Sequence, residues 1–214
     1  MIEIQPVRLT RTLLILALIL PGLYLTSHYS YLLFHTLVEI FVIVISGGVF
    51  ILAWNTRQML DNQYLLFIGI GFLFVAGFTV LHTLTYKGMG VFPETGANLP
   101  TQLWIATIYM HSLTFMLASF FIDRSFKIGY VVGGYVLVTV VLLASIFWQI
   151  FPDCYIEGQG LTPFKVISEY IVGLIFLISI GFLVKHRHKF EPDVLGLLII
   201  AIVFNIAAEI VFTF

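Results

Sequence analysis

His35 and Glu39 lie four residues apart in a stretch of almost unbroken apolar sequence, Phe34 to Trp54. The stretch is long enough to cross a bilayer as one helix, and residues four apart share a helix face. The imidazole and the carboxylate therefore point the same way, and such a pair inside a membrane can bind a proton, a metal ion or a polar ligand. A simpler interpretation stays open, because histidine and glutamate also form hydrogen bonds that only hold helices together.

Further polar residues fall inside the other apolar segments. If the N-terminus is cytoplasmic, most of them lie in the outer half of the membrane, and only His111 lies nearer the midplane. Many ionisable groups in one layer are costly in a membrane unless they serve a function. We therefore predict an outer-leaflet pocket for a small ligand or a proton, formed by His35, Glu39, His82, His111, Glu169, Asn205 and Glu209.

A metal or haem site is an alternative interpretation of the same residues. Imidazole and carboxylate suit zinc, iron or copper, and a haem b could be held by histidines of two adjacent helices. The metal ligands would be His35, His82 and Glu39. The spacing is not specific, because no HExxH motif occurs and His35 with Glu39 is the only histidine–carboxylate pair at helical spacing. A pocket without a cofactor is therefore favoured.

The composition of the chain predicts that these polar residues are positioned by membrane-spanning helices. The chain has 214 residues, of which 60% are hydrophobic and 10% charged, and this is typical of a polytopic all-α membrane bundle. A net charge of -1 leaves no basic surface for nucleic acid, and the single cysteine, Cys154, excludes an internal disulfide. We predict one domain over residues 1–214 with seven transmembrane helices: Thr12 to Tyr31, Phe34 to Trp54, Tyr64 to Thr85, Thr101 to Ile122, Tyr130 to Phe151, Lys165 to Val184, and Val194 to Phe214.

The basic residues predict the orientation, because positively charged loops stay in the cytoplasm. A cytoplasmic N-terminus places eight of the ten lysines and arginines inside: Arg8, Arg11, Arg57, Arg124, Lys127, Lys185, Arg187 and Lys189. Only Lys87 and Lys165 are then outside. The longer outer loops, 86–100 and 152–164, are rich in turn formers, and we expect them to cap the pocket. Their capping residues, with neighbours in the adjoining helices, are Tyr86, Lys87, Gly88, Pro100, Gln102, Trp104, Asp153 and Lys165.

Other functions have less support. No phosphate loop, zinc-cysteine motif or nucleophile elbow occurs, so the sequence does not indicate an enzyme. A transporter of protons or small molecules is a second alternative, but it needs polar groups through both leaflets, and the inner halves of the predicted helices are almost wholly apolar. The glycine pairs are predicted to mark close helix contacts. They are Gly47 and Gly48, Gly69 and Gly71, and Gly133 and Gly134.

Several motifs resemble one family, the bacterial membrane-associated sensor domain of the third type. They are FHTLVEIF (34–41), AWNTR (53–57), LHTLTYKGMGVF (81–92), ANLPTQLWIA (97–106), FPDC (151–154), GLTPFK (160–165) and SEY (168–170). They cover most of the chain, and YKGMGVF and NLPTQLW are quite specific.

The resemblance implies a multi-pass sensory input module of the bacterial cytoplasmic membrane. In that family, such modules precede the cytoplasmic output domains of histidine kinases, diguanylate cyclases and other two-component and signalling proteins. It implies signal reception rather than catalysis, with the lipid bilayer and an output domain as partners and a homodimer in the full-length protein. The family usually has one more membrane helix, so an eighth is expected beyond Phe214, and His111 stands where the family often has an acidic residue.

Overall fold

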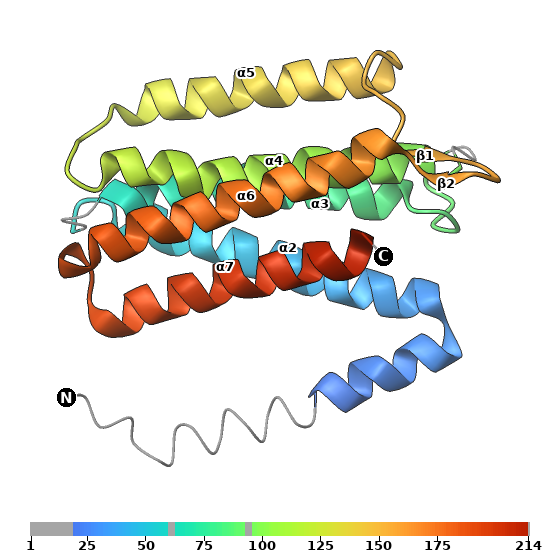
Figure 1. The fold of residues 1–214 in the computed structure, drawn as a ribbon, viewed down its shortest axis with the longest axis horizontal. Helices are drawn as coiled ribbons and strands as arrows, with labels where there is room; N and C mark the ends of the chain where they lie inside the picture. The colour runs from blue at the N-terminus through green and yellow to red at the C-terminus, as the bar shows by residue number, and fades with distance from the viewer. Residues whose placement is uncertain (1–18, 60–62, 93–95, 214) are drawn as a thin grey trace. The chain divides into compact units, whose positions relative to one another are not determined.

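The computed structural model describes residues 19–59, 63–92 and 96–213, and most of them are α-helical (Figure 1). Contacts divide the chain into two units, Met1–Val42 and Ile43–Phe214. In the first unit, a helix over residues 19–29 is followed by α2 (Tyr31–Thr56), which continues into the second unit. Ser30 separates the two helices, and its hydroxyl accepts a hydrogen bond from the backbone N–H of Leu33 at 3.3 Å, as an N-cap residue does.

The second unit holds the remaining helices and one short hairpin. They are α3 (Gln63–Thr85), α4 (Asn98–Ala118), η1 (Ser119–Phe121), α5 (Ile128–Phe147), β1 (Tyr155–Ile156), β2 (Gly160–Leu161), α6 (Pro163–Lys185), η2 (Arg187–Lys189) and α7 (Pro192–Thr213). Six helices in the described residues are long and apolar enough to span a membrane, so the all-α membrane bundle is confirmed. The first of the seven predicted spans begins at Thr12, and its residues 12–18 lie outside the described part.

Several helix boundaries differ from the prediction by a few residues, and the start of α4 and the end of α5 show a local reason. The helix α4 begins at Asn98 rather than Thr101, because Pro100 is tolerated in a first turn that needs no N–H partner. The helix α5 ends at Phe147 rather than Phe151. The chain turns sharply just after it, at Gln149, whose φ of 59° is uncommon for a residue other than glycine.

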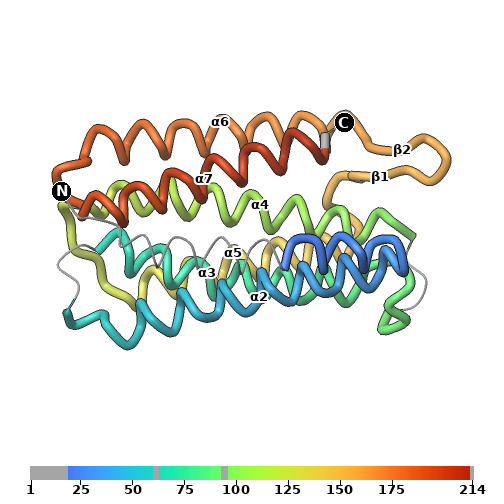
Figure 2. Tube along the Cα trace, turned by 90° about the horizontal axis from the view of Figure 1, so that it is seen from below, coloured from blue at the N-terminus to red at the C-terminus, as the bar shows by residue number. Residues whose placement is uncertain are grey.

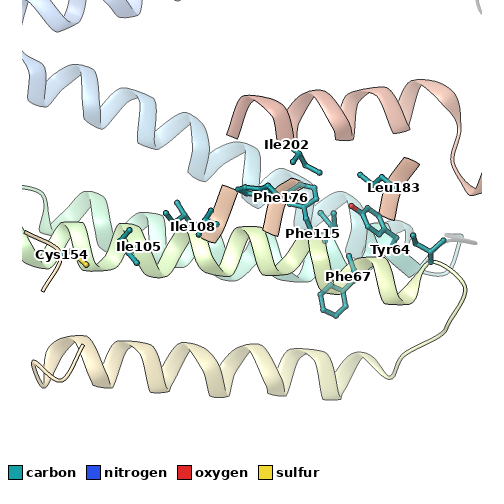
Figure 3. Close-up of a cluster of buried hydrophobic side chains, with 13 residues drawn as sticks. Tyr64, Phe67, Ile105, Ile108, Phe115, Cys154, Phe176, Leu183 and Ile202 are labelled. Carbon is teal, nitrogen blue, oxygen red and sulfur yellow. The ribbon is translucent and has the colours of Figure 1, made fainter. Parts of the chain in front are cut away.

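In the second unit, α4 packs between α3 and α6, and α7 packs along α6 (Figures 1 and 2). Figure 3 shows the aromatic and aliphatic core that these helices share, which includes Phe67, Phe115, Phe176 and Ile202. The helices α3 and α4 are the most buried spans, whereas α5 and α7 expose most of their apolar surface. In a bilayer that exposed surface faces lipid, which is as apolar as the core.

The glycine prediction is confirmed for one pair and wrong for two. A Cβ at Gly69 would lie 2.2 Å from the Cβ of Ala53, and one at Gly71 would lie 2.4 Å from Thr114, so both positions bring helices close together. A Cβ at Gly47, Gly48, Gly133 or Gly134 would meet nothing within 4 Å. Of the three predicted pairs, only Gly69 and Gly71 therefore lie at a close helix contact.

Candidate functional site

The start of α6 is built to hold charged side chains inside the bundle. Thr162 caps the helix by accepting a hydrogen bond from the backbone N–H of Lys165, and Pro163 occupies the first helical position, where a missing N–H costs nothing. One turn later comes Glu169, on the same helix face as Lys165. Both residues are buried, with 3% and 2% of their surface exposed.

Lys165 and Glu169 form an ion pair that also ties α6 to α7. The Lys165 ammonium contacts the Glu169 carboxylate and donates a hydrogen bond to the backbone carbonyl of Phe212 at 2.7 Å. Glu209, one turn before Phe212 on α7, is also buried at this end of the two helices. We call Lys165, Glu169 and Glu209 the charged cluster. Lys165, predicted as the first residue of the sixth span and as a neighbour of the capping loops, lies in the first turn of α6, because the Thr162 cap and Pro163 start the helix two residues before it.

Aromatic side chains connect the charged cluster to α3 and α4. The ring of Phe212 lies 5.7 Å from that of Trp104, which lies 5.4 Å from the imidazole of His82. His82 is buried at the end of α3, and its Nδ1 donates to the carbonyl of Pro100 at 2.8 Å. A neutral His82 ring thus carries its proton on Nδ1 and its lone pair on Nε2.

Asn98 ties the start of α4 to the loop that precedes α6. Its amide nitrogen donates to Asp153 Oδ1 at 2.7 Å, and its oxygen accepts from the backbone N–H groups of Cys154 and Tyr155 at 2.9 and 3.1 Å. Thr162, the cap of α6, donates to the Asp153 carbonyl at 2.6 Å. The loop is thus a short bonded path from α4 to the charged cluster.

Cys154 is enclosed in this loop and is chemically quiet. Burial, followed by the negative charge of Asp153, raises the pKa of the Cys154 thiol to about 12. Because the thiolate is the reactive form, a raised pKa makes this cysteine inert in the folded chain.

A cavity of about 720 Å³ lies beside the loop, between the start of α4 and the end of α5. Amide and carboxylate groups face it from Asn98, Gln102, Gln149 and Asp153. Its remaining lining is apolar: Phe92, Leu99, Ile146 and Phe147. Gln102 also donates to the carbonyls of Phe151 and Pro152 at 3.1 and 3.0 Å, which fixes the cavity wall. The volume and the few convergent polar groups are typical of a small-molecule site.

Within the second unit, the predicted residues fall into separate groups. His82, Glu169 and Glu209 lie at the end of the second unit that also holds the cavity, which we call the polar end. His111 is instead packed against three rings of α3, α4 and α6, at centroid distances of 4.9 to 5.7 Å, from Phe72, Phe115 and Phe176. Asn205 donates to the Ala201 carbonyl of its own helix, and within residues 96–213 it forms no hydrogen bond with the charged cluster.

His35 and Glu39 lie on the first-unit part of α2, with 3.9 Å between Nδ1 and Oε1. The ring of Tyr31 stacks on His35 at 6.4 Å. Imidazole and carboxylate on one helix face fit the donor types that zinc or iron accepts. A metal or haem on His35, Glu39 and His82 stays a prediction, and metal analysis and a visible absorption spectrum of the purified protein test it.

The residues predicted to cap the pocket lie in different surroundings. Gln102 and Asp153 line the cavity, and Pro100 and Trp104 contact His82. Tyr86 lies 6.2 Å from the His82 ring, and beyond it the exposed Lys87 and Gly88, with a φ of 97°, form a turn.

Sequence reasoning missed the pairing of Lys165 with Glu169, and it missed Asn98 altogether. The i,i+4 spacing of Lys165 and Glu169 was a visible signal for their pairing, the same as that of His35 and Glu39. Asn98 gave no such signal, because its partners are 55 to 57 positions away and include backbone groups.

One family model matches residues 26–214, and its description is membrane-associated sensor domain. No curated protein and no solved structure matches the chain.

Proposed function

Because the chain belongs to the family of membrane-associated sensor domains (MASE3), we propose that it detects a small polar solute or a proton at the polar end. A membrane sensory input role is common to the family, and the chain is a multi-pass membrane protein. The proposal adds the place of detection and the route of the signal.

The main observation behind the proposal is that one loop, the one preceding α6, lines the cavity and also leads directly into the helix that holds Lys165 and Glu169. Asp153 lines the cavity, while its carbonyl accepts a hydrogen bond from the Thr162 cap of α6. A solute that binds the Asp153 carboxylate or the Asn98 amide competes with the bond between them. This competition would weaken the bonds by which the loop and its Thr162 cap fix the first turn of α6, where Lys165 lies.

The charged cluster then supplies the two states that a sensor needs. With Lys165 bonded to Glu169 and to the Phe212 carbonyl, the start of α6 and the end of α7 are held together. Without these bonds, α7 can move along α6. A solute or a proton shifts this equilibrium only if it binds one state more tightly than the other.

The positions of the basic residues indicate which end of the bundle would transmit the signal. In the second unit, Arg57, Arg124, Lys127, Lys185, Arg187 and Lys189 follow or precede helix termini at the end opposite the charged cluster, which we call the basic end. The positive-inside rule makes the basic end cytoplasmic. We propose that a histidine kinase or diguanylate cyclase output domain of the full-length protein, paired in a homodimer, receives the signal there.

The polar side chains farther inside the helices favour a sensor over a transporter. Thr79, Thr107, Thr114 and Ser179 each donate to the carbonyl four residues earlier in their own helix. Such hydroxyls satisfy the backbone of one helix and provide no path for a proton or an ion from one end to the other.

The experiment uses Cys154 as a built-in reporter. Membranes containing the protein are treated with a maleimide while amino acids, sugars, dicarboxylates and pH are varied. Because Cys154 is buried and inert in the folded chain, its basal labelling should be slow. An active solute or a pH change that loosens the loop should raise its labelling rate by more than it changes the rate of a small free thiol treated in the same way. Gln102→Leu, which lines the cavity, should abolish a solute response, whereas the exposed Lys87→Met should retain it.

Two results would contradict the proposal. A response that is unchanged in Gln102→Leu would place the solute elsewhere. A labelling rate that is insensitive to every solute and to pH, in a protein whose output still responds to them, would show that the loop does not carry the signal.

A further inference from the structure

A long apolar groove runs between α4 and α5, on a different side of α4 from α6. Its cavity has a volume of about 500 Å³, and six of its lining residues are Tyr109, Leu113, Leu117, Gly134, Val138 and Leu142. The packing explains why it is open. Tyr135 of α5 reaches inward, with its hydroxyl 2.7 Å from that of Thr114, while a Cβ at Gly134 would meet nothing within 4 Å.

The groove has the length of a lipid tail. Its lining extends along α5 from Tyr130 to Leu142, about 18 Å at 1.5 Å per residue. One leaflet of a bilayer has a hydrocarbon thickness of about 15 Å, half of the core. Because the groove is apolar and lies among membrane-spanning helices, water does not fill it, and a hydrocarbon chain is the available occupant.

The tail alone cannot select a lipid, because the surrounding bilayer is as apolar as the groove. Selection must come from the end of the groove. Tyr130 lies there, and the Lys127 ammonium lies 5.7 Å from the centre of its ring. Arg124 is exposed in the same short loop.

The charge of this loop end is positive. Its one acidic residue, Asp123, bonds to the Lys189 ammonium at 2.7 Å, so its charge is already matched. Neither Arg124 nor Lys127 has an ion pair within the described ranges. Lys127 beside the lining residue Tyr130, and Arg124 three residues earlier in the same loop, complement the phosphate of an anionic lipid.

We propose that the groove holds one acyl chain of an anionic phospholipid, whose phosphate binds Lys127 and Arg124. The bound lipid fills the space between α4 and α5 and fixes the position of α5. The site is separate from the cavity at the polar end, so it adds a lipid requirement to the proposed sensor.

Native mass spectrometry of the detergent-purified protein tests the site, with equal amounts of phosphatidylglycerol and phosphatidylcholine that carry the same tails. Phosphatidylglycerol should be retained preferentially, by about fivefold for each cation. Lys127→Gln with Arg124→Gln should remove the preference. Lys185→Gln, a loss of charge at the same end but away from the groove, should keep it.

The tail is tested separately on α5. Gly134→Leu fills the groove and should abolish retention of both lipids, whereas Gly133→Leu, on the preceding residue and outside the groove lining, should not. If Gly134→Leu does not fold, Val138→Phe serves, with the exposed, non-lining Val136→Phe as its control.

Three results would overturn the proposal. The first is equal lipid retention in Gly134→Leu and Gly133→Leu. The second is a lipid preference that survives removal of both cations. The third is a dimer that Gly134→Leu separates, which would assign the groove to a second copy of the chain instead of a lipid.

Discussion

Replacing Lys165 by methionine removes the positive charge of the cluster while keeping a side chain of similar length. Glu169 then remains buried without its lysine partner, and the Phe212 carbonyl loses its donor. Removing one partner of a buried ion pair typically costs about 3–5 kcal/mol. Lys165→Met should therefore lower the free energy of unfolding by an amount in that range.

The measurement is unfolding in mixed micelles, followed by circular dichroism as the denaturing detergent fraction rises. Lys87→Met removes an exposed lysine and should change stability by less than about 0.5 kcal/mol. In the double variant Lys165→Met/Glu169→Gln, the total loss should be smaller than the two single losses added, by about 1–3 kcal/mol. Additive losses, or a cost for Lys165→Met below about 1 kcal/mol as at exposed pairs, would refute the buried pairing.

Three further predictions follow from close contacts and from shifted pKa values. Gly71→Ala should destabilise the protein by about 1–3 kcal/mol in the same assay, because its Cβ would overlap neighbouring atoms, whereas Gly77→Ala, with open space around it, should not. Cys154 should resist iodoacetamide at pH 8 in the folded protein and react after unfolding, since its pKa is raised to about 12; rapid labelling of the folded chain would contradict its burial. The bond to Lys189 lowers the pKa of Asp123, so thermal melts should show a small loss of stability in Asp123→Asn at pH 7. That difference should disappear as the pH falls from about 4 through the lower pKa of the folded state, and a loss that persists in acid would refute the assignment to charge.

The helices were predictable because each one needs only length and apolar composition to span a bilayer. The location of Glu169 and Glu209 in the same half of the helices was predictable from helix direction alone. Burial of Lys165 was not predicted. Lys165 was counted as a basic residue of the outer side, and such a count does not show that Thr162 and Pro163 start the helix early enough to bring the lysine into the bundle.

Contacts between distant parts of the chain were the hardest to predict. Asn98 recognises mainly backbone N–H groups, which every residue carries, so the sequence of the loop does not reveal its partner. The glycine pairs look alike in sequence, yet only Gly69 and Gly71 face another helix, because the face that each residue presents depends on packing rather than on composition.

The hydrogen bond from Lys165 to α7 is accepted by a backbone carbonyl, and this affects whether the same contact can be recognised in related sequences. Any residue at position 212 supplies the same acceptor, whereas at position 165 only a long cationic side chain can span the gap. Sequence variation should therefore be restricted at position 165 by this bond but not at position 212. A search for pairs of positions that vary together would overlook a contact that holds two helices in place.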